Sequence, residues 1–261
     1  MSVFDFPMGA RIYLLVLTAI IGLVMGSFCN AWGWRIAHHE SISHGRSKCP
    51  KCGHVLSALD LFPLFSWIAL GGKCRYCKAP ISARYPISEF VSMLVYLSVI
   101  MRFGFTADAF RFIILLSLLF TASLVDIDIM EIPDSMLIFA CLASLLRLIN
   151  GLGVIPDMLT GFFAVSVPLL IFVLIAEHVL KKPAMGGGDI KLIAVLGLHF
   201  GAAATLLILI VSCFLGIFTA VAGRIGKGTE FPFGPSIAAA AWLVMLFGER
   251  IISWYLGLFG M

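Results

Sequence analysis

The sequence predicts an all-α polytopic membrane protein with about eight transmembrane helices and one small insert outside the bilayer. Of its 261 residues, 61% are hydrophobic and only 12% are charged, whereas a soluble domain carries about 25% charged residues. The mean hydropathy is +1.07. These values exclude a soluble cytosolic enzyme, a disordered chain and a secreted disulfide scaffold. The net charge of +4 is too small to indicate nucleic-acid binding.

Eight apolar runs follow one another along the chain, and a helix needs about 20 apolar residues to cross a bilayer. The long run at 190–223 exceeds one span, so we split it near Gly201. The first run is long and has only Arg11 as a basic residue near its start, which argues against a signal peptide. The expected spans are 10–34, 86–101, 109–125, 135–149, 158–180, 190–203, 204–223 and 235–256.

The segment 35–85 differs from these runs because it is rich in basic residues. It contains eight Lys and Arg residues against two acidic ones, so the positive-inside rule places it in the cytoplasm. Alternation of the helices then puts both termini outside, with thirteen Lys and Arg residues inside and five outside. The later loops contribute Lys181, Lys182, Lys191, Arg224 and Lys227 to the inside set. We therefore divide the chain into a first transmembrane helix (1–34), a cytoplasmic insert (35–85) and a seven-helix membrane domain (86–261).

Four of the seven cysteines form two CxxC motifs within the insert. Cys49 and Cys52 make the first, Cys74 and Cys77 the second, and twenty-one residues separate them. This spacing is close to that of structural zinc sites, and four thiolates complete a closed tetrahedron with no catalytic position. The sequence therefore predicts a Zn²⁺ that staples a chain segment too poor in apolar residues to fold alone. Disulfides and free thiols are the alternatives, although the cytoplasm disfavours stable disulfides.

Three acidic residues lie at the cytoplasmic edge of the expected bilayer. Asp126 ends a span that runs inward, Asp189 opens the sixth span after three glycines, and Glu89 lies just inside the second span. Ionisable groups at membrane depth are costly and are therefore functional candidates. Other acids, including Asp60 and Asp157, lie in loops or near helix ends, where we expect them to be solvated.

Asp126 and Asp189 can form a catalytic pair if they meet in space. One carboxylate would act as a base on water while the other, protonated, polarises a carbonyl group. The glycines before Asp189 allow a sharp bend and the close approach of a peptide. The residues alone leave open that these acids are helix caps and solvated loop acids, since Asp189 is also a good N-cap. The sequence contains no HExxH, GxSxG, GxGxxG or Walker motif in a suitable context.

The ordered motifs of this chain resemble those of the bacterial type IV prepilin peptidases, also called leader peptidase/N-methyltransferases. The resemblance covers nearly the whole chain, and the set of motifs is far more specific than any single one. Departures occur at 33–40 and at 60–63. The matching segments are Gly26-Ser-Phe28-Cys-Asn30 with Arg35, the two CxxC pairs, Pro63-Leu-Phe-Ser66-Trp67, Gly72-Lys-Cys-Arg75, Ile81-Ser-Ala-Arg84-Tyr85-Pro86 with Glu89, Asp126-x-Asp128-x4-Pro133-Asp134, Gly-x-Gly-Asp189-x-Lys191 and Phe233-Gly234-Pro235.

The resemblance implies a GxGD-type intramembrane aspartyl peptidase of the bacterial inner membrane, with its active site and zinc loop on the cytoplasmic side. Such an enzyme cuts the basic leader from prepilins or pseudopilins after a glycine. It then methylates the new N-terminal residue with S-adenosylmethionine. The family pattern makes Asp126 and Asp189 the catalytic residues and makes 86–261 the catalytic domain. Asp128 lies about 200° around the helix from Asp126, so the two do not face Asp189 together.

The methyl-donor site and the partners are less closely specified. Arg84 and Glu89 are candidates for S-adenosylmethionine binding because they lie at the same cytoplasmic edge. The expected partners are the prepilin or pseudopilin substrates and membrane lipid, without nucleic acid, and the oligomeric state is left open.

Two alternative functions accompany the main one. The first is a prepilin peptidase without methyltransferase activity, since the sequence contains no separate methyl-donor fold. The second is a zinc-bearing membrane transporter or receptor in which the acids form an ion path. A transporter would carry polar residues through several spans, whereas here they gather at one face of the membrane.

Overall fold

The structure is a computed structural model that describes residues 3–41, 45–182, 184–222 and 231–258. Over these ranges the regular secondary structure is helical, and two isolated β-bridges are the only extended pairings. The chain forms two compact units, Met1–Ala109 and Phe110–Met261. Arg224 and Lys227, which we expect in the cytoplasm, lie outside the described residues. The functional division of the chain at residues 34 and 85 stays a prediction.

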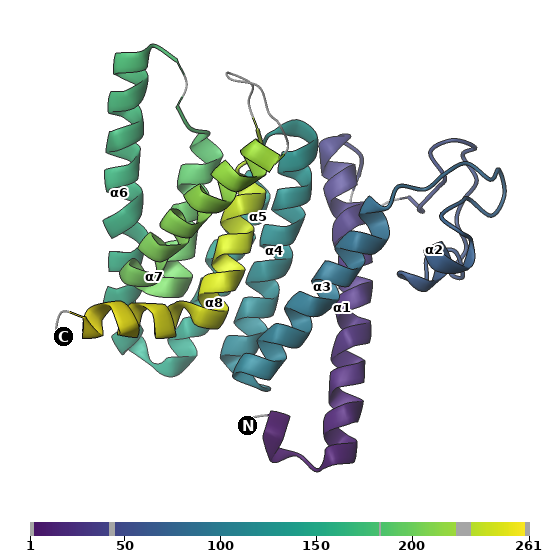
Figure 1. Ribbon diagram of the computed structural model, residues 1–261, viewed down its shortest axis with the longest axis horizontal. Helices are drawn as coiled ribbons and strands as arrows, with labels where there is room; N and C mark the ends of the chain where they lie inside the picture. Colours follow the sequence, from purple (N-terminus) through teal and green to yellow (C-terminus); the bar gives the residue numbers. More distant parts are fainter. Residues whose placement is uncertain (1–2, 42–44, 183, 223–230, 259–261) are drawn as a thin grey trace. The chain divides into compact units, whose positions relative to one another are not determined.

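The first unit is built on two long helices, α1 (Met8–Ala37) and α3 (Arg84–Phe103), which pack side by side (Figure 1). The insert between them holds the short helix α2 (Phe65–Ala69). Glycines allow the close approach of α1 to α3: a Cβ atom on Gly26 would lie 2.8 Å from the Cα of Glu89. Small residues serve this purpose in many membrane helix pairs, because they let two backbones meet. The packing therefore places Glu89 directly against α1.

The second unit contains the remaining helices, and α7 (Gly187–Ala222) is central to it. This helix packs against α5 (Asp134–Ser144), α6 (Ile155–Leu180) and α8 (Gly234–Gly257), as Figure 1 shows. The unit also includes most of α4 (Ala107–Ile129) and two 3₁₀ turns, Leu145–Asn150 and Leu152–Val154. Gly161 of α6 and Gly197 of α7 meet backbone to backbone, so neither position has room for a side chain.

Helix α7 is broken at Gly201, the position at which the sequence predicts a division between two spans. The backbone there has φ 76° and ψ 175°, which is not helical. Residues with a side chain rarely adopt such a conformation, whereas glycine does so at little cost. The break therefore separates a shorter first segment from a longer second one.

The all-helical membrane class is confirmed, but the count of eight spans is not. Six helices in the described part of the chain are long and apolar enough to cross a bilayer. The expected span at 135–149 corresponds to α5 together with the 3₁₀ turn Leu145–Asn150 that follows it directly, and this segment is not one of the six helices. The expected spans at 190–203 and 204–223 correspond to the two segments of α7, on either side of the break at Gly201. Apolar composition marks all eight runs, but it does not fix where each helix ends.

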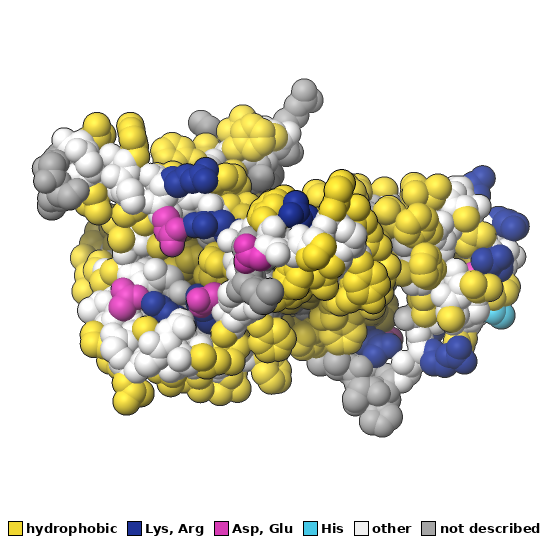
Figure 2. Space-filling model, turned by 90° about the horizontal axis from the view of Figure 1, so that it is seen from below, with side chains coloured by type: hydrophobic (Ala, Val, Ile, Leu, Met, Phe, Trp, Pro, Cys, Tyr) yellow, Lys and Arg dark blue, Asp and Glu magenta, His cyan; other side chains and the backbone are white. Residues whose placement is uncertain are grey.

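Large apolar side chains on the outer faces of the helices support membrane insertion. Phe172 of α6 and Phe214 and Phe218 of α7 are each about 70% exposed, which is unfavourable for a helix in water. The space-filling view shows hydrophobic side chains over much of the visible face, with charged groups in a few separate places (Figure 2). The chain is therefore an integral membrane protein.

Candidate catalytic dyad and cysteine cluster

The four patterned cysteines lie on two turns with the same backbone arrangement. In the first turn, the Cys49 N–H donates to the His54 carbonyl (2.9 Å) and the Gly53 N–H to the Cys49 carbonyl (2.8 Å). The same two bonds recur twenty-five positions later, where Cys74 pairs with Ala79 and Lys78 with Cys74. An isolated β-bridge closes each turn. The chain thus presents two matching half-sites for one ion.

The sulfur positions fit a tetrahedral metal. The four Sγ atoms all lie within 4.8 Å of one another, and Cys49 Sγ is 3.9 Å from Cys77 Sγ. A Zn–S bond of about 2.3 Å gives tetrahedral S···S edges of about 3.8 Å. Hydrogen bonds from the backbone N–H groups of Cys52 and Lys51 lower the pKa of Cys49 to about 6, which favours the thiolate that binds metals, whereas burial and the other three thiols raise the pKa of Cys77 to about 11. The cluster can therefore hold a metal ion.

Asp60 is bonded to the second cysteine turn, which the sequence did not reveal. Its side chain is only 4% exposed and accepts bonds from Arg75 Nε (2.6 Å), Ser57 Oγ (2.7 Å) and Tyr76 Oη (3.3 Å). The Arg75 guanidinium holds the pKa of Asp60 well below its usual range. Our expectation that Asp60 is solvated is wrong, because its ion-pair partner lies fifteen residues further along the chain.

Glu89 lies at a junction of three segments in the first unit. It is buried, at 7% exposed, and its Oε2 accepts the backbone N–H of Leu64 at 2.7 Å. The Ser27 hydroxyl of α1 donates a further hydrogen bond to the same carboxylate. Glu89 therefore ties α3 both to α1 and to the end of the insert before α2.

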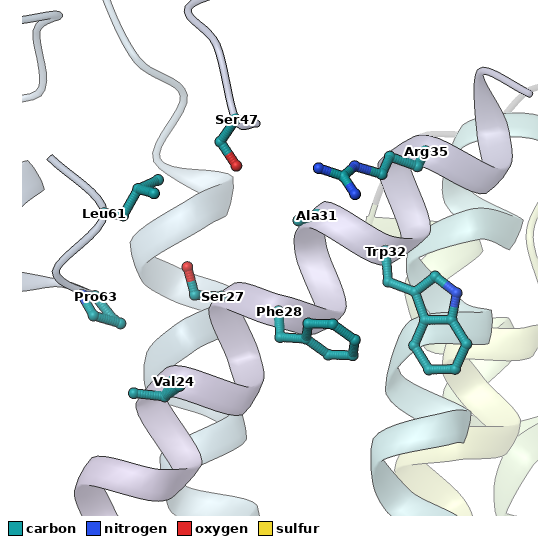
Figure 3. A pocket seen from close by; sticks show the side chains of 9 residues that line it. All are labelled: Val24, Ser27, Phe28, Ala31, Trp32, Arg35, Ser47, Leu61 and Pro63. Atoms are coloured by element: carbon teal, nitrogen blue, oxygen red, sulfur yellow. The ribbon is translucent and has the colours of Figure 1, made fainter. Parts of the chain in front are cut away.

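A cavity of about 320 Å³ lies next to this junction, between α1 and the insert (Figure 3). Its α1 wall includes the aromatic rings of Phe28 and Trp32, whose centroids are 5.6 Å apart, and the guanidinium of Arg35, which also donates to the Gly45 carbonyl. Neither Arg84 nor Glu89 is among the lining residues, although Glu89 bonds to Ser27, which is one of them. The nine lining residues are Val24, Ser27, Phe28, Ala31, Trp32, Arg35, Ser47, Leu61 and Pro63.

This face of α1 is not among the sites that we expect from the sequence. The helical spacing of positions 24, 28, 31 and 35 places them on one face of a helix, so the signal was present. Because the face is largely apolar, its pattern is the same as that of a lipid-facing helix surface.

The structure places Asp126 and Asp189 in the second unit, at the end of α4 and the start of α7. Asp126 is buried at 5% exposed, and the backbone N–H of Gly234, at the start of α8, donates to its Oδ2 at 2.8 Å. The charges of Asp126 and Asp189 are close enough to interact. Three helix ends therefore converge on these carboxylates.

Further contacts hold the start of α7 against the connection between α4 and α5. Lys191 Nζ is 2.8 Å from Asp134 Oδ1. Gly188 packs on Ile132, where a Cβ atom would come within 3.1 Å of the isoleucine side chain. Asp128 is exposed rather than buried, in line with its predicted position on another face of α4. The catalytic assignment of Asp126 and Asp189 itself stays a prediction.

A second polar cluster in this unit surrounds the break in α7, and the sequence did not indicate it. Arg111 is buried and donates to the carbonyl oxygen of His199 at 2.9 Å. Arg147 donates to the carbonyl of Leu198 at 2.9 Å and pairs with Asp157 at 2.7 Å. Two arginines thus satisfy carbonyl groups that the break at Gly201 leaves without helical partners. Asp157 is 55% exposed, as we expect for a solvated acid, and it also pairs with Arg147 in this cluster.

Comparison with known proteins identifies two family regions. Residues 20–103 match the Bacterial Peptidase A24 N-terminal domain, and residues 113–221 match the Type IV leader peptidase family. These regions correspond closely to the two structural units. No solved structure matches the chain.

Similar proteins with curated names lead to the same family. The chain is 35% identical to a prepilin leader peptidase/N-methyltransferase of Bacillus subtilis, over 93% of this chain and 98% of that protein. A protein of the same name from Pseudomonas aeruginosa is 31% identical over 98% of both chains. One from Aeromonas hydrophila is 35% identical over 81% of this chain and 74% of that protein. With matches of this length and two family models in the expected order, the chain belongs to the type IV leader peptidase family.

Proposed function

We propose that this protein removes the leader peptide from prepilins or pseudopilins and then N-methylates the new N-terminal residue. The observation that carries the proposal is that Asp126 and Asp189 lie at converging helix ends, close enough for their charges to interact, in a chain of this family. The names of the relatives, which combine a leader peptidase with an N-methyltransferase, support both activities.

The proposed cleavage uses the two carboxylates as a proton-sharing pair. One carboxylate removes a proton from water as the water oxygen attacks the peptide carbonyl, and the other, protonated, donates to the carbonyl oxygen. The C–N bond then breaks. The water oxygen stays in the new carboxyl group of the leader, and the amine takes up the proton removed from water. No covalent enzyme intermediate is required, in contrast to serine or cysteine peptidases.

The membrane setting supports this choice of substrate. A prepilin has a basic leader in the cytoplasm and an apolar segment in the bilayer, so its scissile bond lies near the membrane surface. We place the carboxylates and the insert on the cytoplasmic side of the bacterial inner membrane, because the insert is strongly basic. Membrane lipid is then a constant partner of the exposed helix faces.

Two small components complete the proposal. We propose that Cys49, Cys52, Cys74 and Cys77 hold a Zn²⁺ that folds the insert and takes no part in catalysis. When bound, S-adenosylmethionine would supply the methyl group: the lone pair of the new amine would attack the methyl carbon, the C–S electron pair would leave on the sulfur of S-adenosylhomocysteine, and the nitrogen would lose one proton. The lining of the cavity beside Glu89 fits S-adenosylmethionine, since it combines a guanidinium and two hydroxyls that can donate hydrogen bonds with two aromatic rings.

The function is tested by incubating the purified protein in detergent with a prepilin and S-adenosylmethionine, followed by mass spectrometry of the product. We expect a shortened prepilin that carries one methyl group on its new N-terminus. A shortened product without the methyl group would favour the peptidase-only alternative. An uncut prepilin, under conditions in which a curated relative cuts it, would contradict the proposed function.

A further inference from the structure

We propose that the cavity between α1 and the insert is the methyl-donor site, in which Arg35 binds the donor carboxylate and Phe28 and Trp32 provide its aromatic wall. The inference rests on the proposed methyltransferase activity and adds to it a location, a set of contact residues and a positioning residue. It assigns the site to the first unit, whereas the two aspartates lie in the second.

The shape of the cavity follows from the spacing on α1. Val24, Phe28, Ala31 and Arg35 recur at helical intervals and form one wall, and Ser47, Leu61 and Pro63 of the insert form the other. The volume of about 320 Å³ lies at the lower end of the range for small-molecule sites, roughly 300–1,000 Å³. Arg35 is in the last turn of α1, so its guanidinium stands at the end of the helix that meets the insert.

The chemistry of the lining matches the parts of the donor. A guanidinium binds a carboxylate through paired, charge-assisted hydrogen bonds. Figure 3 shows the Arg35 guanidinium reaching over Ala31 toward Ser47, rather than away from the cavity. Phe28 and Trp32 contribute two rings whose centroids lie 5.6 Å apart and whose planes are tilted by 46°, and aromatic faces attract both an adenine ring and a sulfonium cation.

Glu89 acts on this site as a positioning residue. Its carboxylate accepts hydrogen bonds from Ser27, which lines the cavity, and from the backbone of Leu64, which follows the lining residue Pro63. Leu64 has φ 62°, an unfavourable value for a residue with a branched side chain. The Glu89 bond therefore holds one edge of the insert in the conformation that closes the cavity.

The decisive measurement is ligand affinity, because it does not depend on turnover. We would titrate the full chain in detergent with S-adenosylhomocysteine, which has the donor's carboxylate but no transferable methyl group. Arg35→Gln should weaken this affinity by about tenfold or more, as expected for the loss of hydrogen bonds to a charged group. The same variant should bind 5′-methylthioadenosine, which lacks the carboxylate, as tightly as the parent does.

Controls separate this effect from general damage. Arg102→Gln removes the same charge from the far end of α3 and should leave both affinities unchanged. Glu89→Ala should weaken both ligands because the cavity wall moves, whereas Glu89→Gln can still accept the Leu64 N–H and should restore most of the affinity. Equal affinity of Arg35→Gln and the parent for S-adenosylhomocysteine would overturn the location.

A second measurement needs no variant. A photoreactive S-adenosylmethionine analogue, bound to the parent protein, should crosslink within residues 24–35 or 47–63. An adduct confined to the second unit would overturn the proposal. If the parent cuts prepilin but binds neither ligand, both this proposal and the methyltransferase half of the function fail, while the peptidase half stands.

Discussion

The backbone N–H of Gly234 donates a 2.8 Å hydrogen bond to the Asp126 carboxylate, across 108 positions of sequence. This bond fixes one oxygen of a buried acid and links the start of α8 to the end of α4. Because Gly234 has no side chain, the backbone of α8 can approach the carboxylate directly. The position of Asp126 therefore depends on the backbone of a residue that has no side chain.

The first prediction tests this close approach. A Cβ atom at Gly234 would lie 2.8 Å from Asp126 Oδ2, so Gly234→Ala should displace the carboxylate and lower prepilin cleavage at least tenfold. The loss of hydrogen bonds to a charged group, about 1.5–3 kcal/mol, corresponds to that factor. Gly257→Ala in the same helix is the control, since nothing lies within 4 Å of its added Cβ. Normal cleavage by Gly234→Ala would show that this bond is dispensable.

The second prediction concerns the two aspartates. Asp126→Asn and Asp189→Asn should each abolish cleavage of a prepilin, because each removes one member of a proton-sharing pair. The double variant should be little worse than either single one, since residues that act as a unit are not additive. Asp128→Asn should keep clear activity because Asp128 is exposed. An inactive Asp128→Asn beside an active Asp126→Asn would reverse our choice within this segment.

The third prediction concerns the cysteine cluster. Cys74→Ser should lower the bound zinc per chain and make the insert more sensitive to limited proteolysis, because the ion staples two turns. Cys213→Ser, a cysteine outside the cluster in α7, should keep the full metal content. Zinc is measured by atomic absorption on the purified protein. Full activity in a preparation without metal would contradict a structural role for the zinc ion.

The fourth prediction follows from the low pKa of Asp60. An acid whose pKa is depressed on folding stabilises the fold fully above its unfolded value, near 3.9, and loses that effect as pH falls through the folded value. Asp60→Asn should therefore destabilise the insert by an amount that is constant between pH 5 and pH 8. Thermal unfolding at several pH values measures this, with Glu40→Gln as an exposed control. A difference that changes steeply within that window would point to another titrating group.

The fifth prediction concerns the break in α7. Gly201→Ala should lower stability by about 1–3 kcal/mol, because φ is 76° there and the new Cβ would lie 2.6 Å from Asp157 Oδ1. Gly153→Ala is the matched control, since open space surrounds it. Chemical unfolding in detergent provides the measurement. Equal stability of the two variants would mean that the segment straightens without cost.

Features set by local sequence could be predicted, and features set by distant partners could not. The two CxxC turns and the break near Gly201 follow from spacing, glycine and length. The buried state of Asp60 depends on Arg75, and the burial of Arg111 depends on His199 eighty-eight positions away, so composition gives no sign of either. Phe28 and Arg35, which line the cavity, belong to a motif that the sequence already indicates. The opposite wall is formed by the folded insert, so the cavity itself could not be predicted. The sequence predicts that Asp126 and Asp189 lie at similar depth in the membrane. The hydrogen bond from Gly234 to Asp126 is visible only in the folded structure.

The repeated backbone of the two cysteine turns also bears on how this family can diversify. Each turn closes on itself through its own hydrogen bonds, so the chain between Leu56 and Gly72 does not have to hold the metal geometry. Doubling the length of a flexible loop costs only about 0.6 kcal/mol. Insertions or deletions in this loop are then tolerated wherever they spare the anchors at Asp60 and Leu64. The two cysteine turns therefore allow the loop between them to change in sequence and length while the membrane helices stay unchanged. One wall of the neighbouring cavity changes with this loop.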